Sequence, residues 1–598
     1  MVLPVVPCVI LVLWLLITGA TLILLRQMQS DASKRQGSLC QGIMINLYTA
    51  MALLVIPTTT TVLLPLEALI VLALVACVGL GLSETVPQLL GIARNLPFLV
   101  KSWLRAEGSG TGTRVAAEAQ EDPPQGSRLC MLLAAYIPNE TETLPRTLRQ
   151  FLPVEDGGNG VELPPKTLIL LTYNPTPTPE QQEVLDECAQ LAERIPGASF
   201  AALLVPRSDC KAHNVNAGFA YLARMSPENR PDVVCVMDAD IDVAEQNTVL
   251  LGCERLRQAE PSVAVVSVCT KVSIGSWLVA AEYAMKDIIM TKGYGSLIST
   301  GWLTGNFVFL RCHIALSYGF DEKCLVEDND LMMRLLGDGY FVNHCTDLAV
   351  YTEAPPRLMA FLTQRTRWGQ GATFLTLNRI PELVRSGSFE GMSVLGRLLL
   401  KFRLLAYGFG VRLASKYLIP FLLPTTLVLS WRCGRRPEEC EHFAWQFGLV
   451  GHFGAVYMLV CFTAQFTGAS FKHPWLRFYH YLAFVFLRIP YGIFNAQAPV
   501  IADAQYFLKL NKWIVTERHT SVSSETNTPS TKQKGLASPG GASLSTCSPC
   551  TLSSPLLCST PTPSTTSLSS LDGEGGGPEG AACGAIVAEA AGTYVRTH

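Results

Sequence analysis

Two aspartates stand two residues apart at the end of an apolar run, in the segment Val233-Val-Cys-Val-Met-Asp238-Ala-Asp240. We expect this run to form a buried strand of an α/β sheet, and open α/β sheets bind ligands beyond the carboxyl ends of their strands. Alternate strand positions face the same way, so both carboxylates can project into one crevice. Oxygen ligands at this spacing suit Mg²⁺ or Mn²⁺ held on a diphosphate. A solvated acidic turn is the alternative for Asp238 and Asp240.

A lysine and a second pair of acids lie on either side of this motif. Lys211 follows a predicted strand and opens a predicted helix, where backbone amides and a lysine can hold phosphate. An ordinary helix start is the alternative there. Glu327 and Asp328 precede a helix that we expect to begin near Asn329, and the helix dipole favours acids at that end. A structural first turn accounts for Glu327, whereas Asp328 is our candidate general base.

Gln364, Arg367 and Trp368 form a third cluster, in a segment that follows the Pro355-Pro356 turn. An amide, a guanidinium and an indole about one helical turn apart can bind a diphosphate and stack on a sugar. The packing of an amphipathic helix is the alternative.

Short apolar runs alternate with helical patterns from residue 128 to about residue 375, which predicts an α/β domain with buried parallel strands and crossing helices. The predicted strands are 128–136, 167–174, 201–206 and 233–240, and the predicted helices include 179–194 and 213–224.

The composition of the 598-residue chain indicates a membrane protein, because only 16% of the residues are charged and the mean hydropathy is +0.29. Apolar segments flank the α/β region, and the cations beside them predict that this region is cytosolic. The net charge of −2 provides no basic field, so nucleic acid is excluded as a partner. We predict an N-terminal transmembrane region of about three helices (1–106), a linker (107–127), the α/β domain (128–375), interfacial and transmembrane helices (376–519), and a disordered Ser/Thr/Pro-rich tail (520–598).

The apolar segment Leu395–Trp431 contains several cations in its first half, including Lys401. Two interpretations stay open. Either the cations line a polar passage, or this half lies in the membrane interface with its cations reaching toward water.

The order of these motifs resembles that of family 2 glycosyltransferases, in the membrane-integrated branch that includes cellulose, chitin and hyaluronan synthases. The resemblance covers the chain from its start to residue 519 and leaves out the tail. The motifs that carry it are Tyr136-Ile-Pro-Asn-Glu140, Lys211-Ala-x-Asn-x-Asn216, Asp238-x-Asp240, Thr304-Gly-Asn306, Val326-Glu-Asp328 and Gln364-x-x-Arg-Trp368. Trp513-Ile-Val-Thr-Glu-Arg518 also resembles the closing motif of some cellulose-synthase-like mannan and glucan synthases.

The resemblance implies an α/β domain of the GT-A type, which binds nucleotide sugars, inserted between transmembrane helices. It also implies sugar transfer with inversion at the anomeric carbon. By position, it places Glu140 at the nucleotide base, Lys211 at the phosphates, Asp238 and Asp240 at the metal and diphosphate, Thr304 and Asn306 beside the acceptor, Asp328 as the base, and Gln364, Arg367 and Trp368 at the diphosphate and the acceptor sugar.

One position departs from the family pattern. The family usually carries an acidic pair after its second strand, where an aspartate contacts uracil, but here that strand ends in Asn174. The amide oxygen of Asn174 can still accept a hydrogen bond from a base N–H, although it adds no charge. We therefore expect a UDP-sugar and keep a GDP-sugar as the alternative.

The resemblance predicts an enzyme that extends a polysaccharide, such as a cell-wall glycan, from the plasma membrane or the Golgi. Its partners would be a nucleotide sugar, a glycan or lipid acceptor, and membrane lipid. A non-processive transferase that glycosylates a lipid or a short acceptor is one alternative. An inactive scaffold within a cell-wall complex is another, and the presence of Asp238, Asp240 and Asp328 argues against it.

Overall fold

The computed structural model describes residues 128–286, 300–301, 303–386, 389, 392–405, 476–508 and 595–597, with scattered residues elsewhere. The predicted N-terminal transmembrane region lies almost wholly outside the described residues. So do the linker 107–127, the motif 513–518 and nearly all of the tail. Among the residues that are described, no helix combines the length and the apolar composition needed to cross a bilayer.

Four parallel strands form one half of the sheet and confirm the strands expected from the apolar runs. β1 pairs with β2 and β4, and β2 pairs with β3, always in parallel. Helices cover both faces, so these strands are apolar along most of their length. Their bounds are β1 (Leu129–Tyr136), β2 (Thr167–Asn174), β3 (Ala198–Leu204) and β4 (Val233–Asp238).

The other half of the sheet is mixed. β7 pairs antiparallel with both β4 and β6, while β6 and β8 run parallel with shifts in register. The strand order is β5-β8-β6-β7-β4-β1-β2-β3-β9. The parallel arrangement expected from the sequence therefore describes only part of the sheet. The additional strands are β5 (Asp242–Val243), β6 (Val263–Ile274), β7 (Phe307–Arg311), β8 (Phe341–Glu353) and β9 (Val595–Thr597).

The two faces of the sheet support separate apolar cores. Along β1, Cys130 and Leu132 belong to one core, and Met131 and Leu133 belong to the other, as the alternation of a strand requires. The first core is covered by α9 (Lys211–Ala223), α12 (Cys312–Tyr318) and α13 (Glu327–Gly337). The second is covered by α7 (Thr143–Arg149), α8 (Pro179–Glu193) and α10 (Thr248–Gln258).

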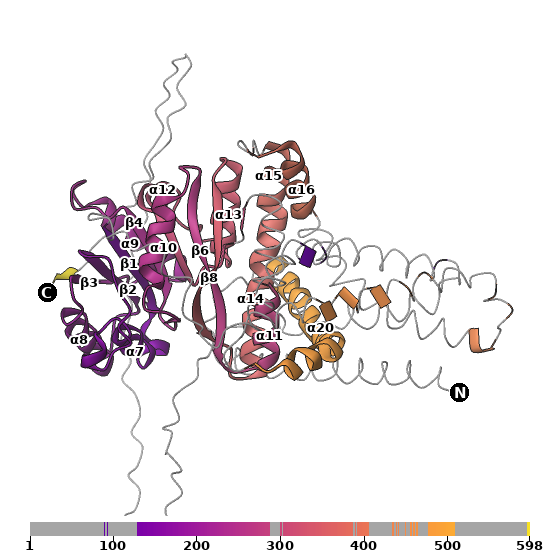
Figure 1. Ribbon diagram of the computed structural model, residues 1–598, viewed down its shortest axis with the longest axis horizontal. Helices are drawn as coiled ribbons and strands as arrows, with labels where there is room; N and C mark the ends of the chain where they lie inside the picture. The colour runs from indigo at the N-terminus through magenta and orange to yellow at the C-terminus, as the bar shows by residue number, and fades with distance from the viewer. Residues whose placement is uncertain are drawn as a thin grey trace, which may run out of the picture. The chain divides into compact units, whose positions relative to one another are not determined.

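Further helices lie beyond the β8 side of the sheet (Figure 1). Phe361 of α14 stacks on Phe494 of α20, and Arg365 of α14 pairs with Glu282 of α11. A π-helical turn, η5, joins α14 to α15 without a break. The bounds are α11 (Trp277–Met285), α14 (Leu358–Phe374), η5 (Leu375–Arg379), α15 (Ile380–Ser386), α16 (Val394–Leu405) and α20 (Phe478–Phe507).

Two helix starts concern functional residues. α9 begins at Lys211, the residue expected to open this helix, two residues before the predicted range 213–224. α13 begins at Glu327 rather than near Asn329, so Glu327 and Asp328 lie in its first turn. Helix ends are the least determined part of a sequence pattern, because capping depends on residues that lie outside the periodic run.

Candidate active site

The end of β4 brings Asp238 to Lys211. The Asp238 carboxylate and the Lys211 ammonium lie 2.5 Å apart. The same ammonium donates to the carbonyl oxygen of Gly305 at 2.7 Å. Lys211 opens α9 and Gly305 lies just before β7, so three segments that are distant in the sequence meet at this point.

Gly305 also binds the predicted base. Its N–H donates to Oδ2 of Asp328 at 2.8 Å, and the N–H of Asn329 donates to Oδ1 at 2.8 Å. A Cβ at position 305 would lie 2.7 Å from the Asp328 Cβ, which is closer than side chains approach one another. One residue, Gly305, therefore contacts the lysine through its carbonyl oxygen and the aspartate through its N–H, and only glycine permits the approach. Gly305 belongs to the predicted motif Thr304-Gly-Asn306, but this role was not predicted from the sequence.

Opposite charges surround the Lys211 ammonium. Burial acts to lower the pKa of Lys211, but the neighbouring carboxylates outweigh burial and raise it, so the side chain keeps its charge. Those carboxylates belong to Asp238, Glu327 and Asp328. Burial also raises the pKa of Glu327, although Lys211 and Arg367 act in the opposite direction. Lys211 and Arg367 therefore favour the charged form of Glu327, against the effect of burial on its pKa.

The turn that carries Asp240 is held from behind by α7. Thr147 donates its hydroxyl to the Ala239 carbonyl at 2.6 Å, and the Gln150 amide donates to the Ile241 carbonyl at 3.1 Å. Asp240 itself is buried and accepts a hydrogen bond from the Thr352 hydroxyl at 3.2 Å. The alternative of a solvated acidic turn is therefore wrong for Asp240.

The donors of this turn fit a divalent ion bound together with a phosphate ligand. The Asp238 side chain is 28% exposed at the end of the strand, and Asp240 supplies a second carboxylate two residues later. In the described part of the chain, no group of three or more His, Cys, Asp or Glu side chains is placed to hold a metal. Two carboxylates suit an ion such as Mg²⁺, which commonly completes its shell with phosphate oxygens and water.

The residues predicted to contact the nucleotide lie at the ends of β1 and β2. Glu140 is buried in the short helix α6 (Ile137–Glu140), and its carboxylate accepts from the Tyr136 N–H at 3.0 Å. The Asn174 amide donates to the Ser208 carbonyl and accepts from Asn214 at 2.8 Å. Asn174 is thus oriented by its neighbours. Asn214 belongs to the motif that begins at Lys211, but its contact with Asn174 was not predicted from the sequence.

Thr304 and Asn306 lie on either side of Gly305. The Thr304 and Ser267 hydroxyls are 3.0 Å apart, and the Asn306 amide and the Thr270 hydroxyl are also 3.0 Å apart. The Asn306 carbonyl accepts from the Asp238 N–H at 2.9 Å. These contacts to β4 and β6 fix the backbone around Gly305.

Gln364, Arg367 and Trp368 lie on α14, as the helical spacing predicted. The Gln364 side-chain oxygen is buried and has no hydrogen-bond partner among the described residues. The Arg365 guanidinium covers the Trp368 ring at 4.5 Å and donates to Glu282 at 2.6 Å. Arg365 was not singled out from the sequence, because a helix position reveals its neighbours only after the helices pack.

The sequence model described as Glycosyl transferase family group 2 matches residues 233–486, which is less than half of the chain. The matched region contains the aspartates of the β4 turn, Asp328 and the three predicted residues of α14. These findings support a family 2 glycosyltransferase. The chain also resembles a Bacillus subtilis protein named "Probable glycosyltransferase YdaM", with 26% identity over 180 residues. That alignment covers 29% of this chain and only 41% of the bacterial protein.

Two solved glycosyltransferases are among the structures similar to this chain. One is a mannosyltransferase from Pyrobaculum calidifontis in complex with GDP-Man and Mn²⁺, with 14% identity and a TM-score of 0.39, covering 68% of this chain and 99% of that one. The other is glucosyl-3-phosphoglycerate synthase from Mycobacterium tuberculosis in complex with Mn²⁺, UDP and phosphoglyceric acid, with 15% identity and a TM-score of 0.27. The second comparison covers 42% of this chain and 79% of that one.

Proposed function

We propose that this chain transfers a sugar from a nucleotide-sugar donor to an acceptor hydroxyl, with inversion at the anomeric carbon. The observation that carries the proposal is the pair of backbone contacts made by Gly305. They join a lysine–aspartate pair suited to a diphosphate to a carboxylate suited to accept a proton. The family match supports the proposal independently, because it rests on sequence similarity rather than on these contacts.

Lys211, Asp238 and Asp240 would form the diphosphate side of the site. A bound Mg²⁺ or Mn²⁺ supplies positive charge that stabilises the leaving diphosphate. Lys211 would add a second positive charge as a point donor to a phosphate oxygen. Because Lys211 already holds the anionic Asp238, donor binding would exchange one anionic partner for another and would not require the lysine to lose its charge.

Asp328 would accept the proton of the acceptor hydroxyl. Two backbone N–H groups fix its carboxylate, one at each oxygen. Oδ1 also accepts from the Asn329 side-chain amide at 3.2 Å, whereas Oδ2 keeps a lone pair that can bind the acceptor hydroxyl without displacing the Gly305 N–H. Glu327 is buried in the same helical turn and would organise this turn. Gln364, Arg367 and Trp368 would bind the diphosphate and the acceptor sugar from α14.

The nucleotide is proposed to be UDP, with GDP as the alternative. Asn174 ends β2 and presents an amide rather than a carboxylate, and Asn214 and the Ser208 carbonyl orient that amide. Its oxygen accepts one hydrogen bond and retains one lone pair, which is enough for a single base N–H. The buried carboxylate of Glu140 supports a nucleotide at the neighbouring strand end.

We also propose that the chain acts at a membrane, with its α/β domain in the cytosol. α16 supports this part of the proposal, because it exposes an apolar stripe on one side and buries Leu400 and Leu404 on the other. Arg397 and Lys401 flank the stripe, as in a helix that lies at a lipid interface. The exposed members are Val394, Leu395, Leu398, Phe402 and Leu405.

A growing polysaccharide is the proposed acceptor, at the plasma membrane or the Golgi. A non-processive transferase that glycosylates a lipid or a short acceptor remains the alternative. The two differ in product size, so a radiolabelled product separated by size distinguishes them. A ladder of long chains supports processive synthesis, and a single addition supports the alternative.

The proposed function is tested by incubating purified chain with a panel of UDP- and GDP-sugars and measuring nucleotide release and sugar incorporation. Asp328→Asn keeps the shape of the side chain but cannot accept the proton. A general base contributes roughly 10²–10⁴-fold, so we expect kcat to fall by that range while nucleotide affinity is retained. An Asp328→Asn variant with more than about a tenth of wild-type turnover would contradict its role as the base.

A further inference from the structure

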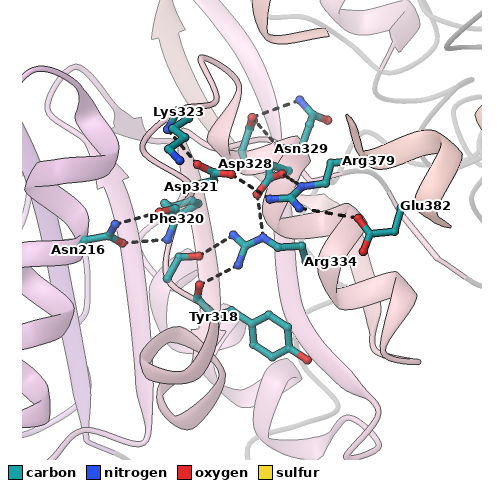
Figure 2. A network of polar contacts seen from close by, with 12 residues as sticks. Asn216, Tyr318, Phe320, Asp321, Lys323, Asp328, Asn329, Arg334, Arg379 and Glu382 are labelled. Carbon is teal, nitrogen blue, oxygen red and sulfur yellow. Dashed lines mark hydrogen bonds and ion pairs between the residues drawn. The ribbon is translucent and has the colours of Figure 1, made fainter. Parts of the chain in front are cut away.

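A second polar network lies on the far side of α13, the helix that carries the proposed base Asp328 and is called the base helix below. Its centre is Asp330 (Figure 2). Asp330 is fully buried, two residues after Asp328 in α13. Both of its carboxylate oxygens are engaged. Oδ2 accepts from Arg334 at 2.7 Å, and Oδ1 accepts from Arg379 at 2.6 Å. A buried carboxylate held by two guanidinium groups is tightly fixed, because the loss of either partner leaves an uncompensated charge.

The same network fixes the loop that precedes the base helix. Arg334 donates its two remaining nitrogens to the carbonyl oxygens of Tyr318 and Gly319, at 2.7 and 2.8 Å. Asn216 of α9 holds the next residue, Phe320, through its carbonyl at 2.9 Å and its N–H at 2.8 Å. The loop is therefore tied both to α13 and to the helix that begins with Lys211.

Arg379 connects this loop to the helix that carries the predicted acceptor residues. Its Nη2 reaches the Asp321 carboxylate at 2.9 Å while its Nε holds Asp330. Arg379 is the last residue of η5, which continues α14 without a break. A π-helical turn holds an additional residue and so rotates the positions that follow it, and such turns are frequent at functional sites.

We infer that Arg379 is a positioning residue, which sets the Asp328 carboxylate against the acceptor-binding residues of α14. This inference rests on the proposed function. One guanidinium joins the base helix through Asp330, the preceding loop through Asp321, and α14 through the continuous backbone. Arg379 is not among the residues proposed to bind donor or acceptor, and its side chain pairs with carboxylates of the chain itself, so its effect on the reaction would pass through the position of Asp328.

Arg379→Gln tests the inference, with kcat measured per nucleotide-binding site. Because a misplacement of about 1 Å can cost about 10²-fold in rate, we expect kcat to fall 10- to 100-fold with the nucleotide Kd within about twofold of wild type. Arg379→Lys keeps the charge but cannot span both carboxylates, so it should recover part of the loss. Asp321→Asn removes only one of the contacts and should cost less than Arg379→Gln.

The matched control is Glu382→Gln. Glu382 lies on the same continuous helix, 3.9 Å from the same guanidinium, but its side chain is 68% exposed. It should retain wild-type kcat. If Arg379→Gln binds nucleotide at full stoichiometry and turns over like Glu382→Gln, the inference is overturned while the proposed function stands. The inference is also overturned if Arg379→Gln loses activity only because fewer molecules bind nucleotide, and if Arg379→Lys recovers none of that activity. A wild-type chain that turns over no nucleotide sugar would overturn both.

Discussion

Replacing Gly305 with alanine tests the contact on which the candidate site depends. The new Cβ would lie 2.7 Å from the Asp328 Cβ and 2.9 Å from its Oδ2. Carbon atoms in contact are normally about 3.5–4.0 Å apart, so the two residues must separate by about 1 Å. Gly305 does not have a positive φ, so alanine adds no backbone strain and the effect comes from the contact alone.

The expected loss follows from that displacement. A shift of about 1 Å in a reacting group can cost about 10²-fold, which corresponds to about 2.7 kcal/mol in the activation free energy. The displaced Asp328 would also lose or lengthen its 2.8 Å hydrogen bond from the Gly305 N–H. We therefore expect Gly305→Ala to lower kcat about 100-fold, within the range of about 10²–10⁴-fold assigned to a general base. Nucleotide affinity should fall less than kcat.

The assay compares kcat, nucleotide Kd and Tm for Gly305→Ala and a control, Gly252→Ala. Gly252 is in α10, where a Cβ would meet the Phe309 ring at 2.2 Å. This control disturbs the apolar core that contains Phe309 and is covered by α10, on the other face of the sheet from α9 and α13, so it should lower Tm while each folded molecule keeps its turnover. A Gly305→Ala enzyme with kcat within about threefold of wild type would refute the positional argument, since the required shift predicts far more.

Three further outcomes are expected. EDTA should abolish turnover and Mg²⁺ or Mn²⁺ restore it, while Asp240→Asn should weaken nucleotide-sugar binding as well as rate; full activity in excess chelator would contradict the metal site. Burial raises the pKa of Glu327, so the stability that its protonated form provides is lost as pH rises through the raised pKa. The Tm of Glu327→Gln should therefore rise relative to the Tm of wild type as pH increases, which is measured from pH 4 to 8. Gly371→Ala should lower kcat, because its Cβ would lie 2.7 Å from the Val326 backbone nitrogen beside the base. Gly369→Ala is the comparison, because a Cβ there faces α20 instead. Equal kcat in the two variants would contradict the expectation.

The parallel strands could be predicted because their apolar runs are continuous, and a run buried on both faces needs no knowledge of its partner. β6, β7 and β8 were not predicted as strands. Their pairing mixes directions and includes register shifts between β6 and β8, and a register depends on which residues of two distant strands meet. Fold class was therefore accessible from local patterns, whereas the sheet order was not.

The candidate site likewise divides into residues that could be predicted from the sequence and contacts that could not. Asp238 and Lys211 could be named from residue type and position, because each lies where a strand ends or a helix begins. Their 2.5 Å pairing could not, since the two lie on separate elements that meet only when α9 packs on the sheet. Arg379 gave no local signal at all. Its partner Asp330 lies 49 residues away, and an arginine on a helix surface has the same sequence pattern whether or not it reaches a buried acid.

Gly305 explains why the donor and acceptor halves of the site depend on each other. Its carbonyl oxygen, in the peptide group shared with Asn306, binds the Lys211 ammonium, and its N–H, in the peptide group shared with Thr304, binds the Asp328 carboxylate. These two planar groups meet at the Cα of Gly305. A movement of Lys211 toward a diphosphate would therefore act on the residue that holds the base. The Asp238 N–H binds the Asn306 carbonyl and would help to keep this segment in place when the lysine changes its partner.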